Sequence, residues 1–571
     1  MPNVTDDTIS RVEPPRPRSM DPKELGFTPQ RPVGWLAPLL LLNTGLRALL
    51  AFLFGAYLDK RELQNSLDGS WFDHSMTEDG EIWLDYVADL GDGFHATYSV
   101  AYLLAQPRLD VGDASLPRGR LLLMGGDQVY PLARGDGYEN RTKGPYRAAL
   151  PETPLAGPRP TLFALPGNHD WYDGLTAFLR LFARRKDGYI GGWLTQQRRS
   201  YFAVRLPANW WLFAIDEQSG AYIDDPQLLY FEKAAQHIRP GDKVILMTPS
   251  PKWVKAKDDP ETYDAIDYFI RAILTPAEAE VRVLVSGDLH HYARYNDAER
   301  ELITCGGGGA YLLATHQLPD ALVVPPVETL TRSKSDSRRY GLRARFPDAA
   351  TSRRMSWGVF GRVPTRNPGF VTMLGLIQTL TMLAMAGAVG QADTIQRLFT
   401  IPLSIMLFLI LAGGVLFAQP TAANRKTHAK RWLLGLSHAL AQIALAIGGT
   451  WVWLRLPPHD WAWPAPLVVA AVIYGPIIGF VSTQLCALYL LIASFFDVNV
   501  NELFAGQGIE DAKSFLRMHI ASDGTLTIHP IGINRICRDW VANPQGAPDS
   551  SWLSPETPLA AHRIEEPVIV K

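Results

Sequence analysis

The sequence predicts two architectures in one chain, a layered α/β domain and an all-α bundle of membrane-spanning helices. The first follows from short β-rich runs between residues 80 and 320 that alternate with turns and helical stretches. The second follows from four long apolar runs between residues 369 and 496 that contain no Asp, Glu, Lys or Arg. With 571 residues, the chain is also long enough for at least two domains.

The overall composition excludes some classes of protein. A formal net charge of -2 provides no excess of basic side chains for a phosphate backbone, so we expect no nucleic acid partner. The three cysteines, Cys305, Cys486 and Cys537, are far apart and have no metal-binding spacing. They predict neither a disulfide framework nor a zinc finger.

The N-terminal part contains a polar segment followed by an apolar one. Residues 1–33 lack the pattern of a secretory signal, and we expect them to form a flexible tail. Residues 34–58 are apolar except for a few positions, among them Asn43 and Arg47. Because an arginine in the middle of a span is costly in hydrocarbon, this membrane-associated helix either spans the bilayer or lies at its interface.

In the predicted α/β domain, residues 80–320, apolar strand-like runs end in polar clusters. Ligand sites in layered sheets gather at such strand ends. Helical periodicity appears between the runs, as at Pro226–Ile238. The predicted strands are Ile82–Ala88, Leu121–Met124, Thr161–Ala164, Trp210–Ile215, Lys243–Met247 and Val281–Ser286.

Residues 321–368 are too polar for a core, with ten Lys or Arg residues against three acids between Leu322 and Pro368, and predict a basic linker. The four apolar runs after it form the predicted transmembrane region, residues 369–496. Each is long enough to cross a hydrocarbon core of about 30 Å. They are Gly369–Gly390, Leu398–Ala418, Trp432–Leu454 and Ala465–Phe496.

The last part of the chain, residues 497–571, predicts a small soluble C-terminal region that packs against the α/β domain or the membrane. We expect a helix at Glu510–Met518 and a hairpin at His519–Pro530, where Asp523-Gly524 is a typical turn.

The loops between the apolar runs predict the orientation of the helices. Residues 424–431 are strongly basic, whereas residues 391–397 and 457–464 are nearly free of positive charge. The basic loop should therefore be cytoplasmic. Counting crossings from it places both the α/β domain and the C-terminus on the cytoplasmic side of an inner (cytoplasmic) membrane.

Four polar clusters follow strand-like runs and could together hold metal ions. Two cations about 3.5–4 Å apart assist the hydrolysis of phosphate esters, and such a pair needs a bridging carboxylate. Asp127 is the natural bridge. Asp89 and His290 would complete the ligands of one metal. Asn168 and a further group would complete the ligands of the other. Carboxylate, imidazole and amide ligands suit Fe, Mn or Zn. The clusters are Asp89-Leu90-Gly91-Asp92, Gly126-Asp127-Gln128-Val129-Tyr130, Gly167-Asn168-His169-Asp170 and Gly287-Asp288-Leu289-His290.

The order Asp-x-Gly, Gly-Asp-x-x-Tyr, Gly-Asn-His-Asp and Gly-Asp-x-His resembles the calcineurin-like metallophosphoesterase superfamily over about residues 80–320. The first two motifs are most similar to the purple acid phosphatase branch, where the tyrosine of the second motif binds ferric iron. The resemblance implies a four-layer αββα sandwich, a metal-dependent phosphoesterase activity and two metals.

The resemblance also implies a role for each matching residue. Asp89, Asp127, Tyr130 and His290 would hold one metal. Asn168 and Asp127 would hold the second metal. His169 would stand beside the leaving group as an acid or as a stabiliser of the phosphate, so that Asp127 and His169 are the predicted catalytic residues.

Two departures from the family pattern concern the second metal. Asp288 occupies a position where the last motif usually has histidine; this form is similar to that of PhoD-type alkaline phosphatases, and Asp288 can still ligate. The histidine usually found after the next-to-last core strand is absent, and Thr248 or Ser250 stands in that region. The second metal would then be weakly held, completed by water or substrate, or given a ligand by His291 or His95.

Other polar positions have competing interpretations. Asp92 either caps the helix that opens at His95 or binds metal. Asp216 is expected to be structural. Gly306–Gly309 lacks the spacing of a dinucleotide motif, and we expect it to let the backbone pass close to the metal site. A basic stretch around Arg184 either steers an anionic substrate or is a solvated surface.

Together these features predict a membrane-anchored, metal-dependent phosphoesterase, and the membrane region favours a lipid-linked phosphate ester as substrate. The alternative is a degenerate metallophosphoesterase domain that senses a ligand and regulates the membrane helices. The missing histidine favours the sensor. The retained Asp89, Asp127, Asn168, His169 and His290 favour the enzyme.

Overall fold

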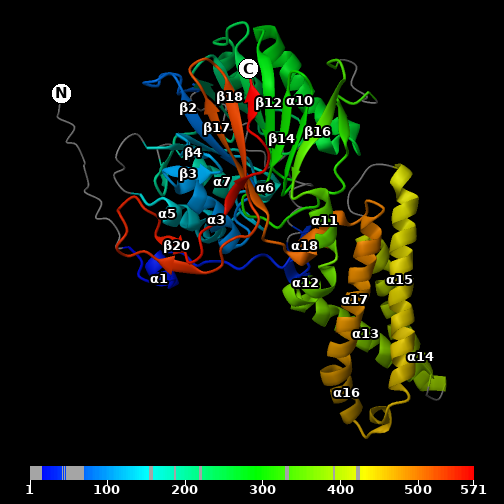
Figure 1. The fold of residues 1–571 in the computed structure, drawn as a ribbon. Coiled ribbons are helices and arrows are strands. Elements are labelled where there is room, and N and C mark those ends of the chain that lie inside the picture. Colours follow the sequence, from blue (N-terminus) through cyan, green and yellow to red (C-terminus); the bar gives the residue numbers. More distant parts are fainter. Residues whose placement is uncertain are drawn as a thin grey trace, which may run out of the picture.

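The computed structural model describes residues 16–40, 43, 45–46, 70–152, 159–184, 188–217, 222–327, 334–389, 393–418 and 425–571. They form a mixed α/β unit with two nine-stranded sheets, and a group of long helices on one side of it (Figure 1). The predicted α/β class with additional apolar helices is confirmed. Most of the membrane-associated segment 34–58 and residues 1–15 of the predicted tail lie outside the described residues.

The first sheet has the strand order β1-β9-β10-β11-β12-β14-β13-β16-β15. Its central strands β10, β11, β12 and β14 are parallel. The strands are β1 (Phe72–Asp73), β9 (Phe202–Leu206), β10 (Trp210–Ala214), β11 (Lys243–Thr248), β12 (Glu280–Ser286), β13 (Tyr292–Asn296), β14 (Glu301–Cys305), β15 (Ala321–Val324) and β16 (Arg338–Phe346).

The second sheet has the order β21-β18-β17-β2-β5-β6-β8-β7, and β22 also pairs with β18. Strands β2, β5 and β6 are parallel. The strands are β2 (Ile82–Val87), β5 (Leu121–Met124), β6 (Thr161–Ala164), β7 (Gly188–Ile190), β8 (Trp193–Thr195), β17 (Lys513–Ile520), β18 (Leu526–Ile533), β21 (Ala561–Arg563) and β22 (Val568–Val570). The six predicted strands of the α/β domain are therefore all present, within a residue at either end.

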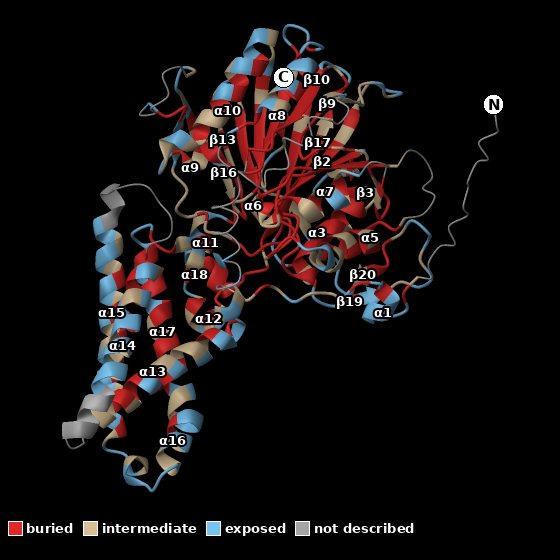
Figure 2. Ribbon diagram, turned by 180° about the vertical axis from the view of Figure 1, so that it is seen from behind, coloured by how far each residue is buried: buried red, intermediate tan, exposed pale blue. Residues whose placement is uncertain are grey.

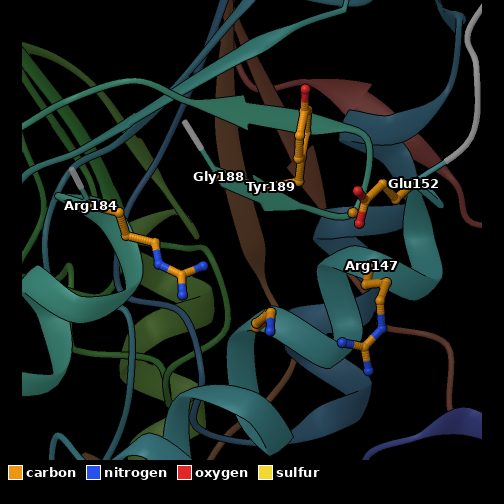
Figure 3. Close-up of a pocket in the computed structure, with 7 residues that line it drawn as sticks. Arg147, Glu152, Arg184, Gly188 and Tyr189 are labelled. Carbon is orange, nitrogen blue, oxygen red and sulfur yellow. The ribbon is translucent and has the colours of Figure 1, made fainter. Parts of the chain in front are cut away.

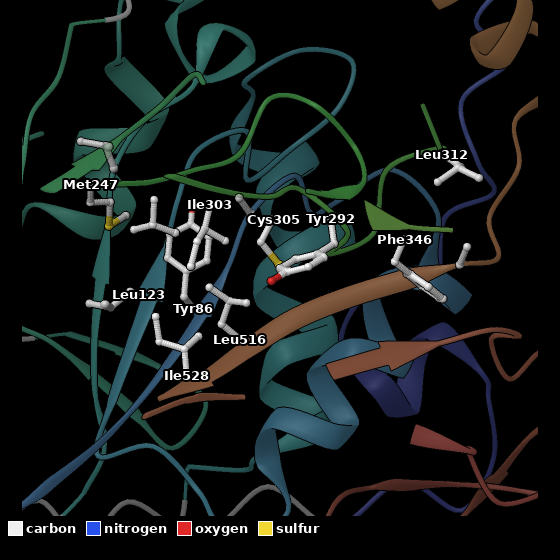
Figure 4. Close-up of a cluster of buried hydrophobic side chains, with 14 of the residues drawn as sticks. Tyr86, Leu123, Met247, Tyr292, Ile303, Cys305, Leu312, Phe346, Leu516 and Ile528 are labelled. Atoms are coloured by element: carbon white, nitrogen blue, oxygen red, sulfur yellow. The ribbon is translucent and has the colours of Figure 1, made fainter. Parts of the chain in front are cut away.

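One apolar cluster joins the two sheets (Figure 4). Leu123 and Leu516 reach it from the second sheet, and Met247 and Ile303 from the first. The alternation of strand side chains places Leu122, next to Leu123, on the opposite face, against helices. Those helices are α3 (Phe94–Ala105), α5 (Gly144–Ala149) and α7 (Thr176–Phe182), while α8 (Asp225–Ala235) and α10 (Asp264–Phe269) cover the first sheet.

The C-terminal region is part of the α/β unit, which differs from the small separate region predicted. The hairpin around Asp523-Gly524 is present as β17 and β18, and β17 pairs with β2 near the middle of the second sheet. The helix expected at Glu510–Met518 is wrong, because β17 begins at Lys513. All residues of β17 except His519 are buried, so pairing on both sides outweighs the local helical pattern.

A buried ion pair fixes this C-terminal strand to the start of the domain. Arg517 of β17 donates through Nε to Asp85 Oδ1 at 2.7 Å and through a second nitrogen to Oδ2 at 3.0 Å. It also donates to the Leu116 carbonyl oxygen at 3.1 Å. Both charged side chains are buried, so the pair orients β17 against β2.

The described parts of residues 321–368, namely residues 321–327 and 334–368, are also structured, whereas the sequence predicts a linker. Strands β15 and β16 extend the first sheet, and helices α11 (Ala349–Ser356) and α12 (Val359–Arg366) follow. Several of the basic residues form ion pairs, such as Arg338 with Asp297 at 2.8 Å and Arg366 with Glu510 at 3.0 Å. Part of the basic composition therefore reflects ion pairs at the sheet edge and on its following helices.

The described part of the predicted N-terminal tail, residues 16–33, packs on the α/β unit. Leu25 and Phe27 are buried in its core, next to the short helix α1 (Pro22–Leu25). Arg16 donates to the carbonyl oxygen of Ser551 at 2.7 Å. The polar composition hid these two apolar anchors, so the tail prediction is wrong for this stretch.

Within the part of the chain that the structure describes, four helical segments are long and apolar enough to cross a membrane, which confirms the four predicted runs. Between 11% and 39% of each apolar window is buried, and Figure 2 shows exposed and intermediate residues distributed among these helices. Small residues bring helices together, as where Gly375 meets Gly479. The helices are α13 (Pro368–Val389), α14 (Asp393–Phe417), α15 (Arg425–Trp453), and α16 (Ala465–Val469) continuing into α17 (Gly475–Ser494).

The chain enters and leaves this helix group at the same end, next to the α/β unit. Helix α12 leads into α13, and α18 (Val500–Gln507) follows α17 and packs against α12. Gln317 donates to the Ser494 carbonyl oxygen at 2.6 Å, across the junction. Figures 1 and 2 both show α6 (Asn168–Trp171), which carries predicted site residues, near the middle of the α/β unit.

Candidate metal centre

The predicted site residues lie at the carboxyl ends of parallel strands from both sheets. Strands β2, β5 and β6 supply one side, and β11 and β12 supply the other. Because these ends meet at one edge, residues distant in sequence come together. Asp89 follows β2, Asp127 and Tyr130 follow β5, Asn168 and His169 follow β6, and Asp288 and His290 follow β12.

Three of the predicted ligands share an unusual backbone conformation. Asp89, Asp127 and Asp288 have φ values of 60°, 51° and 67°, in the left-handed region. This conformation costs of order 1–3 kcal/mol, although Asp tolerates it better than most residues. The same sharp turn after three strands brings the carboxylates into one cluster, where the Asp288 N–H donates to Asp89 Oδ2 at 2.8 Å.

Glycines provide the space that this cluster needs. A Cβ on Gly167 would overlap the Asp127 carboxylate, and a Cβ on Gly306 would overlap Asp89 Oδ2. The prediction that Gly306–Gly309 brings the backbone close to the predicted ligands is therefore confirmed.

The Tyr130 hydroxyl is the point on which the predicted ligands converge. It lies 3.0 Å from Asp89 Oδ1, 3.0 Å from Asp127 Oδ2 and 3.0 Å from His290 Nε2. His290 Nε2 is also 3.6 Å from Asp89 Oδ1. All four side chains are buried. The structure thus brings together the complete set that the family resemblance assigns to the first metal.

The proton on His290 decides which of its ring nitrogens offers a lone pair to this cluster. His290 Nδ1 is 2.8 Å from the Tyr311 carbonyl oxygen, which can only accept, so Nδ1 carries the hydrogen. Burial lowers the pKa of His290 to about 3, so its ring is neutral and Nε2 presents a lone pair. Two carboxyl oxygens and this nitrogen therefore all face the phenol oxygen.

The electrostatics of the cluster favour a cation. Burial, with repulsion from Asp127, raises the pKa of Asp89 well above its usual range. Burial also raises the pKa of Asp127, and it raises the pKa of Tyr130 well above 10, so the phenol keeps its proton. A positive ion would relieve this excess of negative charge.

The donor set fits one metal ion when the tyrosine is included. Among the described residues, no group of three or more His, Cys, Asp or Glu side chains is by itself arranged to hold a metal. Ligands about 2.1 Å from one metal lie about 3.0–3.4 Å apart, and the separations around the Tyr130 oxygen are of this size. Oxygen and imidazole donors of this kind suit Fe, Mn or Zn.

His169 and Asn168 border the cluster without entering it. The His169 N–H donates to Asp127 Oδ1 at 2.9 Å, and its Nδ1 is 2.8 Å from the Pro131 carbonyl oxygen. Its Nε2 is therefore the nitrogen available for proton transfer. Asn168 Nδ2 donates to the Tyr172 hydroxyl at 3.0 Å, so this side chain contacts a tyrosine that the sequence did not indicate.

Asp288 does not join the group around Tyr130. Its Oδ2 lies 2.5 Å from Lys255 Nζ and accepts from Ser250 Oγ at 2.9 Å. Burial by itself raises the pKa of Asp288. The contacts with Lys255 and Ser250 outweigh this effect, so the pKa of the Asp288 carboxyl is below its usual value. Asp288 raises the pKa of Lys255 in turn, against the effect of burial. Both groups are therefore charged.

Aromatic and basic side chains outside the motifs complete the surroundings. The Trp35 ring is 5.7 Å from the rings of Tyr130 and His169 and 5.3 Å from that of Tyr311. Lys513 of β17 donates to the Ala310 carbonyl oxygen at 2.5 Å, and burial lowers the pKa of this lysine to about 8.

Other polar residues named from the sequence have different positions. His291 borders a cavity of about 380 Å³ with Lys257 and Lys430 on its wall, and His95 lies beside Glu510. No described contact joins either histidine to the predicted ligands. The structure therefore provides no support for either as the missing ligand.

Asp92 neither caps α3 nor meets the ligands, since it accepts from the Val33 N–H at 2.7 Å and from Trp35 Nε1 at 3.4 Å. It holds the N-terminal segment over the site. Asp216 accepts from Trp171 Nε1 at 3.1 Å within the core, which is the structural role predicted for it.

The basic stretch around Arg184 borders a separate pocket of about 240 Å³ (Figure 3). Arg147 and Lys143 also line it, and Glu139 pairs with both at 2.7 and 3.1 Å. None of the predicted metal ligands lines this pocket. Both interpretations of the basic stretch therefore stay open.

Three residues near the site escaped the sequence analysis because no motif contains them. Lys255 is in a short helix after β11, where only the missing histidine drew attention. Trp35 lies in a segment interpreted only as part of a membrane helix. Lys513 lies in a strand predicted as a helix. The turn at Asp523-Gly524, which follows β17, is the sequence feature that could have indicated this strand.

Comparisons with known proteins found similarity in structure but not in sequence. No protein-family model matches the chain, and no curated protein matches it. GAP50, the anchor in the inner membrane complex of Plasmodium, is similar with a TM-score of 0.32 and 12% identity, over 48% of this chain and 92% of GAP50. PhoD is similar with a TM-score of 0.27 and 12% identity, over 40% of this chain and 58% of PhoD. Similarity at this level does not assign a family or an activity.

Proposed function

We propose that this protein is a membrane-anchored, metal-dependent phosphoesterase whose α/β unit is a four-layer metallophosphoesterase sandwich. The observation that carries the proposal is the Tyr130 hydroxyl, which lies 3.0 Å from each of three acceptors on Asp89, Asp127 and His290. A core without a metal would gain little from gathering two carboxyl groups and an imidazole around one phenol, since buried polar groups are costly. A metal ion satisfies all of them together.

In this proposal Fe, Mn or Zn is held by Asp89, Asp127, Tyr130 and His290. When bound, such an ion makes water a stronger nucleophile at neutral pH and offsets the charge that develops on a phosphoryl group.

The residues beside the ligands have their own tasks. The His169 N–H fixes the second oxygen of Asp127, and the carbonyl of Pro131 orients the His169 ring. Its Nε2 is then placed to give a proton to the leaving oxygen. Asn168 is the residue expected to position the phosphate or a second cation.

The surface of the helices supports a membrane location. Large apolar side chains are exposed along the helices, among them Leu376, Phe408 and Ile473. Exposed tryptophans occur near both ends, at Trp432 and at Trp463, as in interfacial belts. This arrangement is expected for helices surrounded by lipid.

The orientation proposed is cytoplasmic for both the α/β unit and the C-terminus. Arg353, Arg354 and Arg362 are exposed on α11 and α12, at the end of the helices that joins the α/β unit. At the opposite end, the described residues 455–464 contain a single basic residue other than histidine, Arg455. The excess of positive charge marks the cytoplasmic side.

A lipid-linked phosphate ester is the substrate that this geometry favours. Trp35 packs against Tyr130, and a helical stretch of the chain begins a few residues later, at Pro38. Leu39 there is 83% exposed, so an apolar surface starts next to the site. A substrate held in the headgroup layer could reach the metal centre from that side.

Hydrolysis by the detergent-purified chain tests the function. The metal-loaded protein should hydrolyse p-nitrophenyl phosphate, and should act faster on phosphatidic acid in mixed micelles than on soluble nucleotides. Asp127→Asn and Asn168→Ala should lower turnover about 100-fold or more, since the electrostatic contributions removed are worth several kcal/mol. Asp113→Asn, at an exposed hairpin where Asp113 pairs with Arg563, is the matched control and should have no effect.

Two outcomes would contradict parts of the proposal. A fully metal-loaded protein that hydrolyses no ester on a broad panel would contradict the enzyme. Equal or better turnover of soluble esters would contradict the lipid-linked substrate alone.

One observation favours the alternative role as a ligand sensor. His290 is joined through Tyr311 to Asn501 on α18, because the Tyr311 hydroxyl donates to Asn501 Oδ1 at 2.9 Å. A ligand bound at the metal centre would thereby be linked to the helices. Metal binding without hydrolysis, together with a ligand-dependent change in protease protection of α18, would favour this role.

A further inference from the structure

A pair of charged side chains lies directly beside the predicted ligands. Lys255, in the short helix α9 (Lys252–Lys255), has its Nζ 2.5 Å from Asp288 Oδ2. Ser250 donates to the same oxygen at 2.9 Å. Asp288 donates through its backbone N–H to Asp89. The ammonium group of Lys255 thus contacts Asp288, which in turn contacts Asp89, a member of the group around Tyr130.

This pair adjoins the corner where the second metal is expected. The loop after β11 packs against the loops that carry Asp127 and Asn168, because a Cβ on Gly126 would lie 3.4 Å from the Gly167 Cα and 3.6 Å from the Pro249 carbonyl oxygen. Asp127 is among the charges that stabilise the Lys255 ammonium. The segment after β11, which lacks the expected histidine, therefore places Lys255 close to the expected position of the second metal.

The charges of the three predicted carboxylate ligands and of the lysine that contacts one of them balance with a single metal ion. Asp89, Asp127 and Asp288 carry three negative charges, and one divalent ion with the Lys255 ammonium neutralises them. A ferric ion with a deprotonated Tyr130 gives the same balance. A second divalent ion would leave two positive charges in excess in a largely buried site, which is costly without further partners.

The neighbouring lysines do not share this position. Lys252 pairs with the buried Glu217 at 3.1 Å. Lys257 is exposed and borders the cavity that His291 lines. Within this segment, Lys255 is therefore the lysine directed at the metal cluster.

We propose that Lys255 is the permanent cation of this corner and takes the place of the second metal ion, so that the protein binds one metal per chain. This inference rests on the proposed function, which supplies the first metal. An ammonium group has three donors, and the contact with Asp288 uses one of them. The others would bind the phosphoryl oxygens that a second metal would otherwise hold.

Metal stoichiometry tests the proposal. The full-length protein in detergent is loaded with Mn²⁺, freed of excess ion and analysed by elemental mass spectrometry. We expect about one Mn²⁺ per chain for the wild type and for Lys255→Arg, which keeps the charge. Lys255→Met frees Asp288 and should raise the count to two. Lys257→Met, which removes an ammonium two residues further on, is the matched control and should bind one.

A second variant keeps the test decisive if the vacated corner binds weakly. Ser250→His combined with Lys255→Met adds an imidazole beside the freed carboxylate, and it should bind two Mn²⁺. Two equivalents in either variant support the proposal. One equivalent in both variants overturns it, as do two equivalents in the wild type.

The outcomes separate this proposal from the proposed function. Two equivalents in an active wild type overturn only the role of Lys255. One equivalent in the wild type and two in Lys255→Met, with no hydrolysis of any ester, support the single-metal arrangement and contradict the phosphoesterase. No metal in any folded variant overturns both.

Discussion

Tyr130→Phe is the sharpest perturbation of the site, because it removes one oxygen and keeps the ring. The ring packs against His169 at 4.4 Å and Trp35 at 5.7 Å between centroids, and these contacts persist in the variant. What disappears is the hydroxyl that lies 3.0 Å from Asp89, Asp127 and His290. The variant therefore separates a ligand role for Tyr130 from a packing role.

The hydroxyl has one proton, so it donates one hydrogen bond at a time, here to a carboxylate. Loss of a hydrogen bond to a charged group costs about 1.5–3 kcal/mol, and we expect the metal-free variant to be destabilised by about 2 kcal/mol. With ferric iron bound, the loss is of a different kind, because the ion loses the phenolate donor. The visible absorption of the wild type should then vanish.

Chemical denaturation of the metal-free protein and the visible spectrum of the iron-loaded protein measure the two effects. Tyr172→Phe is the matched control, since Tyr172 lies beside Asn168 and not among the four donors. It should keep the absorption band. A Tyr130→Phe protein with an unchanged band, or a colourless wild type with a full complement of iron, would refute the ligand role.

Two further perturbations concern the fold. Arg517→Met should lower the free energy of unfolding by about 3–5 kcal/mol, because it removes the ion-pair partner of the buried Asp85 carboxylate. Denaturation in detergent measures this loss. A loss below about 1 kcal/mol would contradict the prediction. Burial lowers the pKa of His529 from 6.5 to about 4, so the unfolded chain binds a proton between these values that the folded chain does not. His529 alone should therefore lower the free energy of unfolding by about 2 kcal/mol as the pH drops from 7 to 4, and His529→Leu should make the pH profile shallower over this range.

The cluster around Tyr130 was predictable because its residues follow strands directly. A strand end fixes where the next residues lie, so a short polar cluster after an apolar run can be placed without knowledge of the rest of the fold. Asp89, Asp127, Tyr130 and His290 meet around one oxygen as the motif order indicates. Asp288 also lies next to the cluster, but its partner is Lys255.

The parts that escaped prediction depend on contacts between distant segments. β17 pairs with β2 more than 400 residues earlier in the chain, and no local pattern encodes such a pairing. Its run Lys513–Ile520 is buried on both faces, so the alternation that marks a half-exposed strand is absent. Likewise, the hydrogen bonds from Val33 and Trp35 to Asp92 bring residues of the N-terminal segment to the site, which composition alone cannot show.

The site is attached to the helix group by two separate connections. On one side, Trp35 packs against Tyr130, and the next residue, Leu36, donates to Asn367 at 3.0 Å, just before α13 begins. On the other side, the Tyr311 hydroxyl donates to Asn501 on α18, just after α17.

Both connections involve elements that flank membrane-type helices, and both reach a predicted ligand or its direct hydrogen-bond partner. A displacement of α13 against α17 would therefore change the position of Tyr130 relative to His290. An enzyme would need this link to stay rigid, whereas a sensor would need it to move. The distance between these two ligands in the presence and absence of substrate is thus the quantity on which the two proposed roles differ.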